Sequence, residues 1–399
     1  MSMEEWKEYR FTDVASLTNG RAYLQPELQS VGKYKIVRVG NLSGGDKWFY
    51  SDMELPQEKY CNKGDLLYAW ACSFGPYIWE GDKTIYHYHI WKVDVNSAVA
   101  DKMFLYYYLK YYTPKWMGFT NGSVMMHITK GSLEKQIVSL PSLPTQQKVA
   151  NILSSLDDKI EVNRRINEQL EELAQALFKS WFVDFEPFKD GEFVESELGM
   201  IPKGWKVTKL DEVCSYISRG LTPKYDNDSE EIILGQTCVR NNIVTLNNGR
   251  KHRPKKKNEK WLQQWDVLIN STGVGSLGRV GIVYFDKDNV AIDSHITVVR
   301  PISSLYKHYI GRTLLNKQAE IENMAIGSTG QTELPKDSVK SMLILLPIDD
   351  ILVLFNKSIE PICKLMYSNL EEITQLSNLR DTLLPKLMSG EIDVNEVEL

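Results

Sequence analysis

At 399 residues the chain is longer than one hydrophobic core usually supports, so two or more domains are expected. Its 43% hydrophobic content is that of a globular protein, and no apolar run is long enough and uncharged enough to predict a membrane span or a secretion signal. The five scattered cysteines form no C-x-x-C pair, which argues against a disulfide framework and a zinc site, and we expect a cytoplasmic protein without a bound metal.

The formal net charge of −5 hides a segregation along the chain. Residues 1–144 carry 16 Lys and Arg against 15 Asp and Glu, and residues 200–346 carry 21 against 15. Residues 145–199 carry 6 against 12, and residues 347–399 carry 4 against 10. Large domains that approach phosphate and connecting segments that face solvent or partners would give this pattern, although solvated surfaces give it as well.

Residues 1–143 are predicted to form the first of two mixed α/β domains. Short strand patterns are followed by a helical run over residues 101–112, and then by a polar, glycine-containing loop over residues 121–127. A Leu-Pro pair leads into the next element.

A long helix is predicted within residues 144–190. Asn163 and Asn167 occupy seam positions, where they would set the register by rejecting apolar partners. An ordinary amphipathic helix that packs on its own domain is the alternative. The seam positions alternate by four and three residues, as in a coiled coil: Val149, Leu153, Leu156, Ile160, Asn163, Asn167, Leu170, Ala174, Leu177 and Trp181.

Residues 191–347 are predicted to form the second mixed α/β domain, with a helical run over residues 305–325, and residues 348–399 a second long helix. Pro361 should kink this helix or delay its start. Two long helices in one chain favour mutual pairing as an antiparallel coiled coil, with the two domains related by a pseudo-two-fold axis. The predicted fold class is therefore α+β.

The halves of the chain are an internal repeat. Glu5-Trp6-Lys7 returns as Gly204-Trp205-Lys206, 199 residues later, and Gly64-Asp65-Leu66-Leu67 returns as Trp265-Asp266-Val267-Leu268, 201 residues later. Leu170-Glu171-Glu172 returns as Leu370-Glu371-Glu372, 200 residues later. Because the matches keep their order at a nearly constant offset, the sequence indicates a duplication.

Three stretches at the beginning of the first long helix and within it closely resemble the central helical region of type I restriction enzyme specificity subunits. They are residues 140–148, residues 152–165, which include Leu153-Ser154-Ser155-Leu156-Asp157, and residues 174–185, which include Ser180-Trp181-Phe182. Residues 197–205 are similar to the family's entry to its second recognition domain, and residues 266–278 with Asp293-Ser294-His295 to the middle of that domain. The resemblance spans nearly the whole chain in order.

This resemblance implies a non-catalytic subunit with two target recognition domains. It would read a bipartite double-stranded DNA target, one half-site per domain, with a spacer whose length follows from the helices. The implied partners are two modification subunits, which bind S-adenosylmethionine, and restriction subunits, which use ATP and magnesium. No cofactor is expected in this chain.

Motifs for catalysis were sought and are missing from the sequence. There is no Pro-Pro dipeptide of an amino methyltransferase motif, no Gly-Lys-Ser or Gly-Lys-Thr of a phosphate loop, and no Pro-Asp of a nuclease. Residues 273–278 match G-x-G-x-x-G, but the strand pattern of residues 279–285 follows in place of a helix, so a glycine-rich hairpin is predicted rather than a dinucleotide site. His87, His89 and His295 lack the neighbours of a metal set.

Candidate DNA contacts lie in loops and basic runs of both domains. Arginine and lysine suit phosphate or guanine, asparagine and glutamine suit adenine edges, and small hydroxyl residues permit close approach; plain turns and solvated loops use the same residues. The candidates are Arg38, Asn41, Ser73, Tyr77, Asn121, Ser123, His127, Arg240, Arg253, Lys255, Lys256, Lys257, Ser271, Thr272, Arg279, Ser328, Thr329 and Gln331.

An apolar cluster at the end of the first long helix is the candidate partner surface, namely Leu177, Phe178, Trp181 and Phe182. A joint between this helix and the second domain is the alternative. Two other functions stay open for the whole chain: a self-sufficient DNA methyltransferase with unfamiliar motifs, and a coiled-coil scaffold that never binds DNA.

Overall fold

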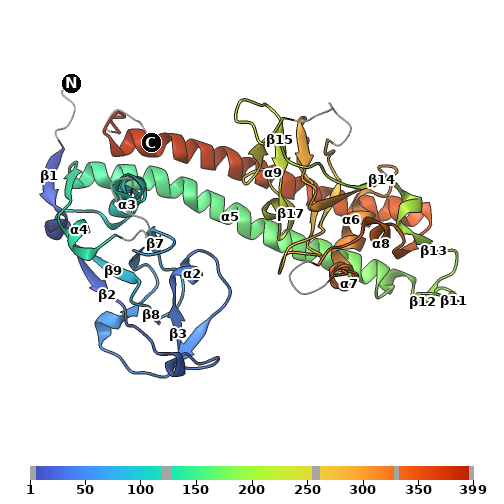
Figure 1. Ribbon diagram of the computed structural model, residues 1–399, viewed down its shortest axis with the longest axis horizontal. Helices are drawn as coiled ribbons and strands as arrows, with labels where there is room; N and C mark the ends of the chain where they lie inside the picture. The colour runs from blue at the N-terminus through green and yellow to red at the C-terminus, as the bar shows by residue number, and fades with distance from the viewer. Residues whose placement is uncertain (1–5, 118–127, 254–260, 328–331, 395–399) are drawn as a thin grey trace. The chain divides into compact units, whose positions relative to one another are not determined.

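The computed structural model describes residues 6–117, 128–253, 261–327 and 332–394. The chain divides into two compact units: the first unit comprises residues 1–162 and 373–399, and the second unit residues 163–372. Each unit holds one mixed α/β domain and a part of each of the two long helices (Figure 1).

The domain of the first unit is built on two four-stranded sheets, with strand orders β2-β9-β6-β7 and β4-β3-β8-β5. A separate antiparallel pair, β1 and β10, joins the beginning and the end of the domain. The elements are β1 (Lys7–Arg10), α1 (Phe11–Val14), β2 (Ala15–Asn19), η1 (Gln25–Glu27), β3 (Tyr34–Val37), α2 (Val39–Leu42), β4 (Phe49–Ser51), η2 (Gln57–Lys59), β5 (Tyr60–Cys61), β6 (Leu66–Ala69), β7 (Gly75–Ile78), β8 (Thr84–Tyr86), β9 (Ile90–Val95), α3 (Lys102–Met117), α4 (Lys130–Glu134) and β10 (Ile137–Leu140).

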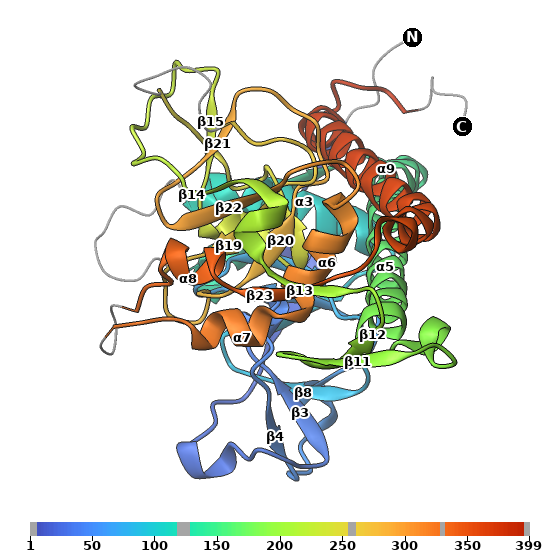
Figure 2. The same cartoon turned by 90° about the vertical axis from the view of Figure 1, so that its right-hand side faces the viewer.

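The domain of the second unit repeats this order with additions. A six-stranded sheet, β14-β22-β19-β20-β17-β16, lies beside a three-stranded one, β18-β15-β21, and α6 packs on the larger sheet (Figure 2). The elements are η3 (Glu186–Phe188), β11 (Phe193–Ser196), β12 (Gly199–Pro202), β13 (Lys206–Lys209), η4 (Leu210–Val213), β14 (Cys214–Arg219), β15 (Ile232–Leu234), η5 (Gln236–Cys238), β16 (Val239–Arg240), β17 (Asn242–Val244), β18 (Arg250–Lys251), β19 (Val267–Asn270), β20 (Val280–Ile282), β21 (Val290–Ile292), β22 (Ile296–Pro301), α6 (Lys307–Asn316), α7 (Gln318–Asn323), α8 (Lys336–Lys340) and β23 (Leu343–Leu346).

Each domain encloses its own apolar core. Central strands such as β6, β19 and β22 consist largely of β-branched, aromatic or other apolar residues that are buried on both faces, which is why they form continuous hydrophobic runs in the sequence. The corresponding pair β1/β10 of the first unit and pair β13/β23 of the second are both antiparallel. The duplication predicted from the sequence is therefore present in the order and pairing of the elements.

The two long helices, α5 (Leu143–Phe182) and α9 (Asp349–Met388), are each 40 residues long. The predicted seam positions of α5 are buried or half-buried, whereas the intervening charged positions are mostly exposed. Pro361 neither delays nor interrupts α9, contrary to the sequence prediction. The helix continues because Phe355, Ile359 and Cys363 around it are buried in the core of the second unit, which outweighs the lost backbone bond.

Polar bonds join the long helices within each unit. In the first unit, Arg380 of α9 donates to Asp157 of α5 at 2.6 Å. In the second unit, Asn163 Nδ2 donates to Glu372 at 2.7 Å, and Asn369 Nδ2 donates to Asn167 Oδ1 at 2.9 Å. The two seam asparagines are therefore satisfied by hydrogen bonds, as buried amides require.

A carboxylate of α5 also attaches each domain to the helices. In the second unit, the buried Glu171 accepts from the Arg312 guanidinium of α6 at 2.6 Å and from Asn242 of β17 at 3.0 Å. Arg312 itself is 2% exposed and donates to the hydroxyl of Tyr284 at 2.8 Å. In the first unit, Asp157 accepts from the Tyr107 hydroxyl of α3 at 2.8 Å and is only half-buried.

Candidate nucleic-acid interface

The same three-residue turn occurs in both units. Residues 87–89, the first turn, connect β8 to β9, and residues 293–295, the second turn, connect β21 to β22. In the first unit, the N–H of Trp70, directly after β6, donates to the carbonyl of His89 at 3.1 Å. In the second unit, the N–H of Ser271, directly after β19, donates to the carbonyl of His295 at 2.8 Å. The N–H of the first turn residue donates to the last residue of β3 at 2.9 Å, or to that of β15 at 3.0 Å.

The remaining bonds of the turns are equivalent as well. The N–H of the third residue donates to the side chain of the first, which is His87 Nδ1 at 3.4 Å or Asp293 Oδ1 at 2.8 Å. A glycine packs against each turn, because a Cβ on Gly20 or on Gly220 would overlap two successive carbonyl oxygens at the end of β8 or β21. The two turns therefore share one backbone framework.

Aromatic rings surround the first turn. The ring of His89 lies 3.9 Å from that of Tyr88 and 4.9 Å from that of Trp70, between centroids. The rings of His87 and Tyr88 are 4.6 Å apart. Trp70 Nε1 donates to the carbonyl of Tyr88 at 2.8 Å, which fixes the indole against the turn while Tyr88 remains 37% exposed.

An arginine stands beside the first turn. Burial, together with electrostatic interactions with His89 and Arg38, lowers the pKa of His87 to about 4. Burial and the charge of Arg38 also lower the pKa of His89. Both imidazoles are therefore neutral at pH 7, and each presents one donor and one acceptor. The exposed Arg38 guanidinium lies 5.2 Å from the centroid of the Phe49 ring of β4.

The second turn has different side chains on the same backbone. His295 is exposed, and its Nδ1 lies 3.5 Å from Oδ1 of Asp293. Burial raises the pKa of the Asp293 carboxyl, while hydrogen bonds from His295 and the charges of His295 and Arg250 lower it. The Arg250 guanidinium of β18 lies 3.9 Å above the ring of Tyr225. The second turn therefore also has an arginine held on an aromatic ring beside it.

The glycine-rich hairpin predicted from the sequence is present, since β19 and β20 pair antiparallel across residues 271–279. Ser271, predicted as a DNA contact, is fully buried, and its hydroxyl lies 2.6 Å from that of Thr297. Ser271 directly follows β19 and is buried like the residues of that strand, so it is unavailable to DNA in this structure. Thr272 accepts from Gln236 Nε2 at 3.2 Å, and Arg279 donates to the carbonyl of Gly275 at 2.7 Å.

Other predicted contacts bind within the chain or lie at the surface. Asn41 closes a turn, because its Oδ1 accepts from the N–H of Arg38 at 3.0 Å and its Nδ2 donates to the carbonyl of Lys47 at 3.0 Å. The half-buried Tyr77 donates its hydroxyl proton to the carbonyl of Ser73 at 3.4 Å.

Two predicted arginines of the second unit are exposed. Arg240 lies at the end of β16, and Arg253 forms an ion pair with Asp226 at 2.7 Å. The remaining candidates lie outside the described residues and are Asn121, Ser123, His127, Lys255, Lys256, Lys257, Ser328, Thr329 and Gln331. The turns themselves carry no signal in the sequence, because a histidine or an aspartate is an ordinary surface residue until its neighbours are known.

The predicted partner cluster packs inside the second unit. Phe178 and Phe182 are 5% and 6% exposed, and their rings lie 6.3 and 4.8 Å from that of Phe355. Leu177 and Trp181 pack half-buried against the same core. The cluster is therefore the joint between α5 and the second domain, and the assignment as an exposed partner surface is corrected.

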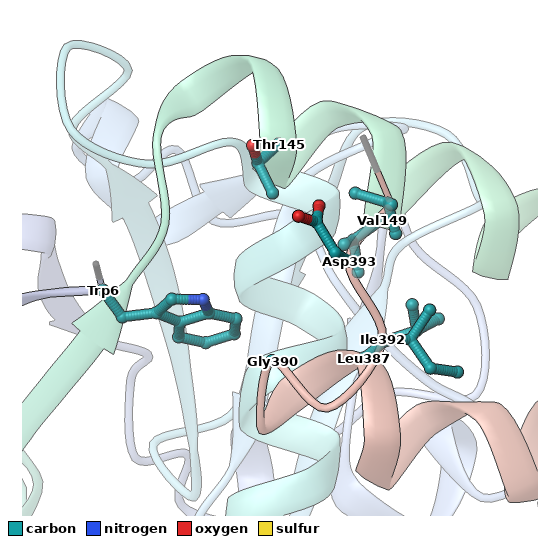
Figure 3. Close-up of a pocket in the computed structure, with 8 residues that line it drawn as sticks. Trp6, Thr145, Val149, Leu387, Gly390, Ile392 and Asp393 are labelled. Atoms are coloured by element: carbon teal, nitrogen blue, oxygen red, sulfur yellow. The ribbon is translucent and has the colours of Figure 1, made fainter. Parts of the chain in front are cut away.

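A cavity in the first unit lies between Trp6, α5 and the end of α9, and Figure 3 shows Trp6 and Val149 facing it. Its free volume of about 20 Å³ has room for one water molecule but not for a cofactor. Among the described residues, no group of three His, Cys, Asp or Glu side chains is placed to hold a metal ion. No helix in the described ranges is both long and apolar enough to cross a membrane.

Comparison with solved structures places the fold among known proteins. The crystal structure of the S subunit of a type I restriction-modification system from M. genitalium is similar, with a TM-score of 0.60, 17% sequence identity and 97% of each chain covered. At this identity the likeness concerns the fold.

Sequence comparison extends the likeness. The MjaIX specificity subunit of a type I restriction enzyme from Methanocaldococcus jannaschii is 30% identical over 74% of this chain and 70% of its own length. The HindI specificity subunit from Haemophilus influenzae is 23% identical over 98% of this chain and 100% of its own. A family model described as the type I restriction modification DNA specificity domain matches residues 3–172 and 202–374. The chain therefore belongs to the type I restriction-modification specificity subunit family.

Proposed function

We propose that this chain reads a bipartite double-stranded DNA target, with one half-site bound by the domain of each unit. The observation that carries the proposal is the duplication, because the family model matches the chain twice and the two domains repeat the same strands and the same turn. Two domains of one fold that carry different surface side chains are suited to two different half-sites.

We further propose that α5 and α9 form an antiparallel coiled coil that relates the domains by a pseudo-two-fold axis. Contacts within the second unit support this arrangement: Asn163 of α5 meets Glu372 of α9, while Asn167, further along α5, meets Asn369, nearer the start of α9. Partners whose numbers rise on one helix and fall on the other belong to antiparallel helices. The helices would then set the spacer between the half-sites.

The chain is proposed to act without chemistry of its own. Two modification subunits would bring S-adenosylmethionine and methylate adenine, and restriction subunits would bring ATP and magnesium. The missing Pro-Pro and Gly-Lys-Ser or Gly-Lys-Thr motifs support this division of labour. The predicted domain limits, residues 1–143, 144–190, 191–347 and 348–399, serve as a guide for constructing exchanges.

Methylation mapping of host DNA with and without the gene tests the proposal. We expect the gene to add one bipartite adenine-methylation motif, and exchange of residues 1–140 for those of another family member to change one half of it. An unchanged methylome would contradict DNA reading and favour a scaffold. Saturable S-adenosylmethionine binding by the purified chain alone would favour an enzyme.

A further inference from the structure

We propose that the first and second turns are the specificity-determining elements of the two domains, each placing its side chains against base edges of one half-site. This inference rests on the proposed function and assigns it to particular residues. None of His87, Tyr88, Asp293 or Ser294 was a candidate contact in the sequence. The argument for them comes from the comparison of the two units.

The first step is that the backbone of the turn is constant while its side chains vary. Three equivalent hydrogen bonds position each turn: one from the N–H of its first residue, one to the carbonyl of its third residue, and one from the N–H of the third residue to the side chain of the first. A histidine and a tyrosine at the first two positions of the first turn are replaced by an aspartate and a serine in the second. A fixed frame with exchangeable side chains allows a domain to change its target without refolding.

The second step is the chemistry that the side chains offer. The neutral imidazole of His89 carries a donor and an acceptor, whereas His87, whose Nδ1 accepts from the N–H of His89, offers a donor at Nε2. The exposed Tyr88 ring offers apolar contact of the kind that suits a thymine methyl group. The carboxylate of Asp293 is an acceptor of the kind that pairs with the cytosine amino group, and the exposed His295 lies next to it. The two turns therefore suit different bases.

The third step is the arginine beside each turn. Arg38 directly follows β3, and Arg250 lies in β18, which pairs with β15; β3 and β15 are the strands that accept a hydrogen bond from the turns. Each guanidinium lies over an aromatic ring, at 5.2 Å from the ring centroid for Arg38 and 3.9 Å for Arg250. A guanidinium held in this way is oriented for a phosphate or a guanine edge. The arginine could bind the DNA phosphate backbone and the turn could contact base edges, which are the two kinds of contact that direct readout combines.

The test exchanges the turns within the chain. The double variant His87→Asp/Tyr88→Ser gives the first turn the residues of the second, and Asp293→His/Ser294→Tyr does the reverse. Each is produced with the host's modification subunits, and the methylation motif is mapped. We expect the first variant to change bases only in the half-site read by the first domain, and the second variant to change bases only in the other half.

Affinity measurements on the purified complex quantify the effect. Binding to the original site should weaken roughly 5- to 150-fold, as expected when one base contact is lost. Asp94→Asn, an exposed change at the far end of β9, is the matched control and should leave the motif unchanged. His89→Gln and His295→Gln are milder variants for use if a double variant does not fold.

The outcomes are distinct. Variants that are folded and active but methylate the original motif would overturn the role of the turns and leave the proposed function intact. Equal loss of affinity for specific and random DNA would also overturn it, because that behaviour belongs to a phosphate contact. A wild-type complex with no bipartite motif would instead refute the proposed function itself.

Discussion

The side chains around the first and second turns differ, although the backbone hydrogen bonds of the two turns are equivalent. Trp70 of the first unit and Ser271 of the second both donate their N–H to the third residue of a turn, yet the indole lies against an exposed aromatic group and the serine is buried against Thr297. Main-chain bonds and a glycine therefore specify the turn. The side chain of the first turn residue supplies only an acceptor for the N–H of the third, which both histidine and aspartate provide, and the second residue differs without that constraint.

A second contrast concerns the ion pair that a carboxylate of α5 forms in each unit, with α6 of the domain in the second unit and with α9 in the first. Glu171 and Arg312 of the second unit form a buried ion pair, whereas Asp157 and Arg380 of the first unit remain partly in solvent. Water weakens the attraction between Asp157 and Arg380, and it can solvate Asp157 if the arginine is removed. The comparison predicts unequal sensitivity to the removal of one partner.

The largest effect is expected for Arg312→Ala. It leaves the carboxylate of Glu171 buried and unpaired, which should lower the free energy of unfolding by about 3 to 5 kcal/mol. Arg380→Ala, the matched change in the first unit, should cost about 1 kcal/mol or less. Urea denaturation of both variants measures the difference. Equal losses in the free energy of unfolding would show that burial does not distinguish the two ion pairs.

A smaller effect is expected from pH. Burial lowers the pKa of His308 to about 4, with the hydrogen bond to Glu360 opposing and the charge of Lys307 assisting. Between pH 6.5 and pH 4 the unfolded chain binds a proton that the folded chain does not, so stability falls as the pH falls, by up to about 3 kcal/mol.

The corresponding residue of the first unit, the second residue of α3, is Met103, whose side chain has no titratable group. His308→Gln should therefore flatten the dependence on pH between 6.5 and 4, as measured by denaturation at a series of pH values. A variant that keeps the full dependence would assign it to other groups.

Ser271→Ala tests the buried hydroxyl pair of the second unit. It leaves the hydroxyl of Thr297 without its partner in the core and should cost about 1 kcal/mol. The double variant Ser271→Ala/Thr297→Val should recover part of this loss, since both polar groups are then removed. Additive losses in the thermal unfolding of Ser271→Ala, Thr297→Val and the double variant would contradict the pairing.

The smallest effect is expected for the two arginines beside the turns. Arg38→Ala and Arg250→Ala should each leave stability unchanged but reduce the slope of log affinity against log salt by about 0.9, if each contacts one phosphate. Titration of the complex with DNA at several salt concentrations measures this slope. A change for one arginine only would mean that the two domains use their cations differently.

The sequence predicted the architecture well because periodicity and repetition are local properties of the chain. The helical runs that begin near residues 101 and 305, the hairpin around residues 271–279 and the long helices all appear. The prediction that Pro361 kinks the second long helix or delays its start was wrong, because tertiary packing outweighs one lost hydrogen bond.

Side-chain roles were less accessible to sequence reasoning. Phe178 and Phe182 form an apolar stripe whether they meet a partner or their own domain, and only the position of Phe355 decides between these. Asn41 and Ser271 have the composition of DNA contacts but satisfy bonds within the chain. The turns were missed because their equivalence depends on backbone bonds between residues far apart in sequence.

The glycines that pack against the turns are encoded far from them in the gene. Gly20 and Gly220 lie outside the turns, so a short gene segment that encodes residues 87–89 or 293–295 can be replaced without touching either of them. Gene conversion between the two halves of the same gene would then produce new alleles in single events. Natural variants of this gene should therefore show clustered codon replacements at the turns, beside invariant glycine codons.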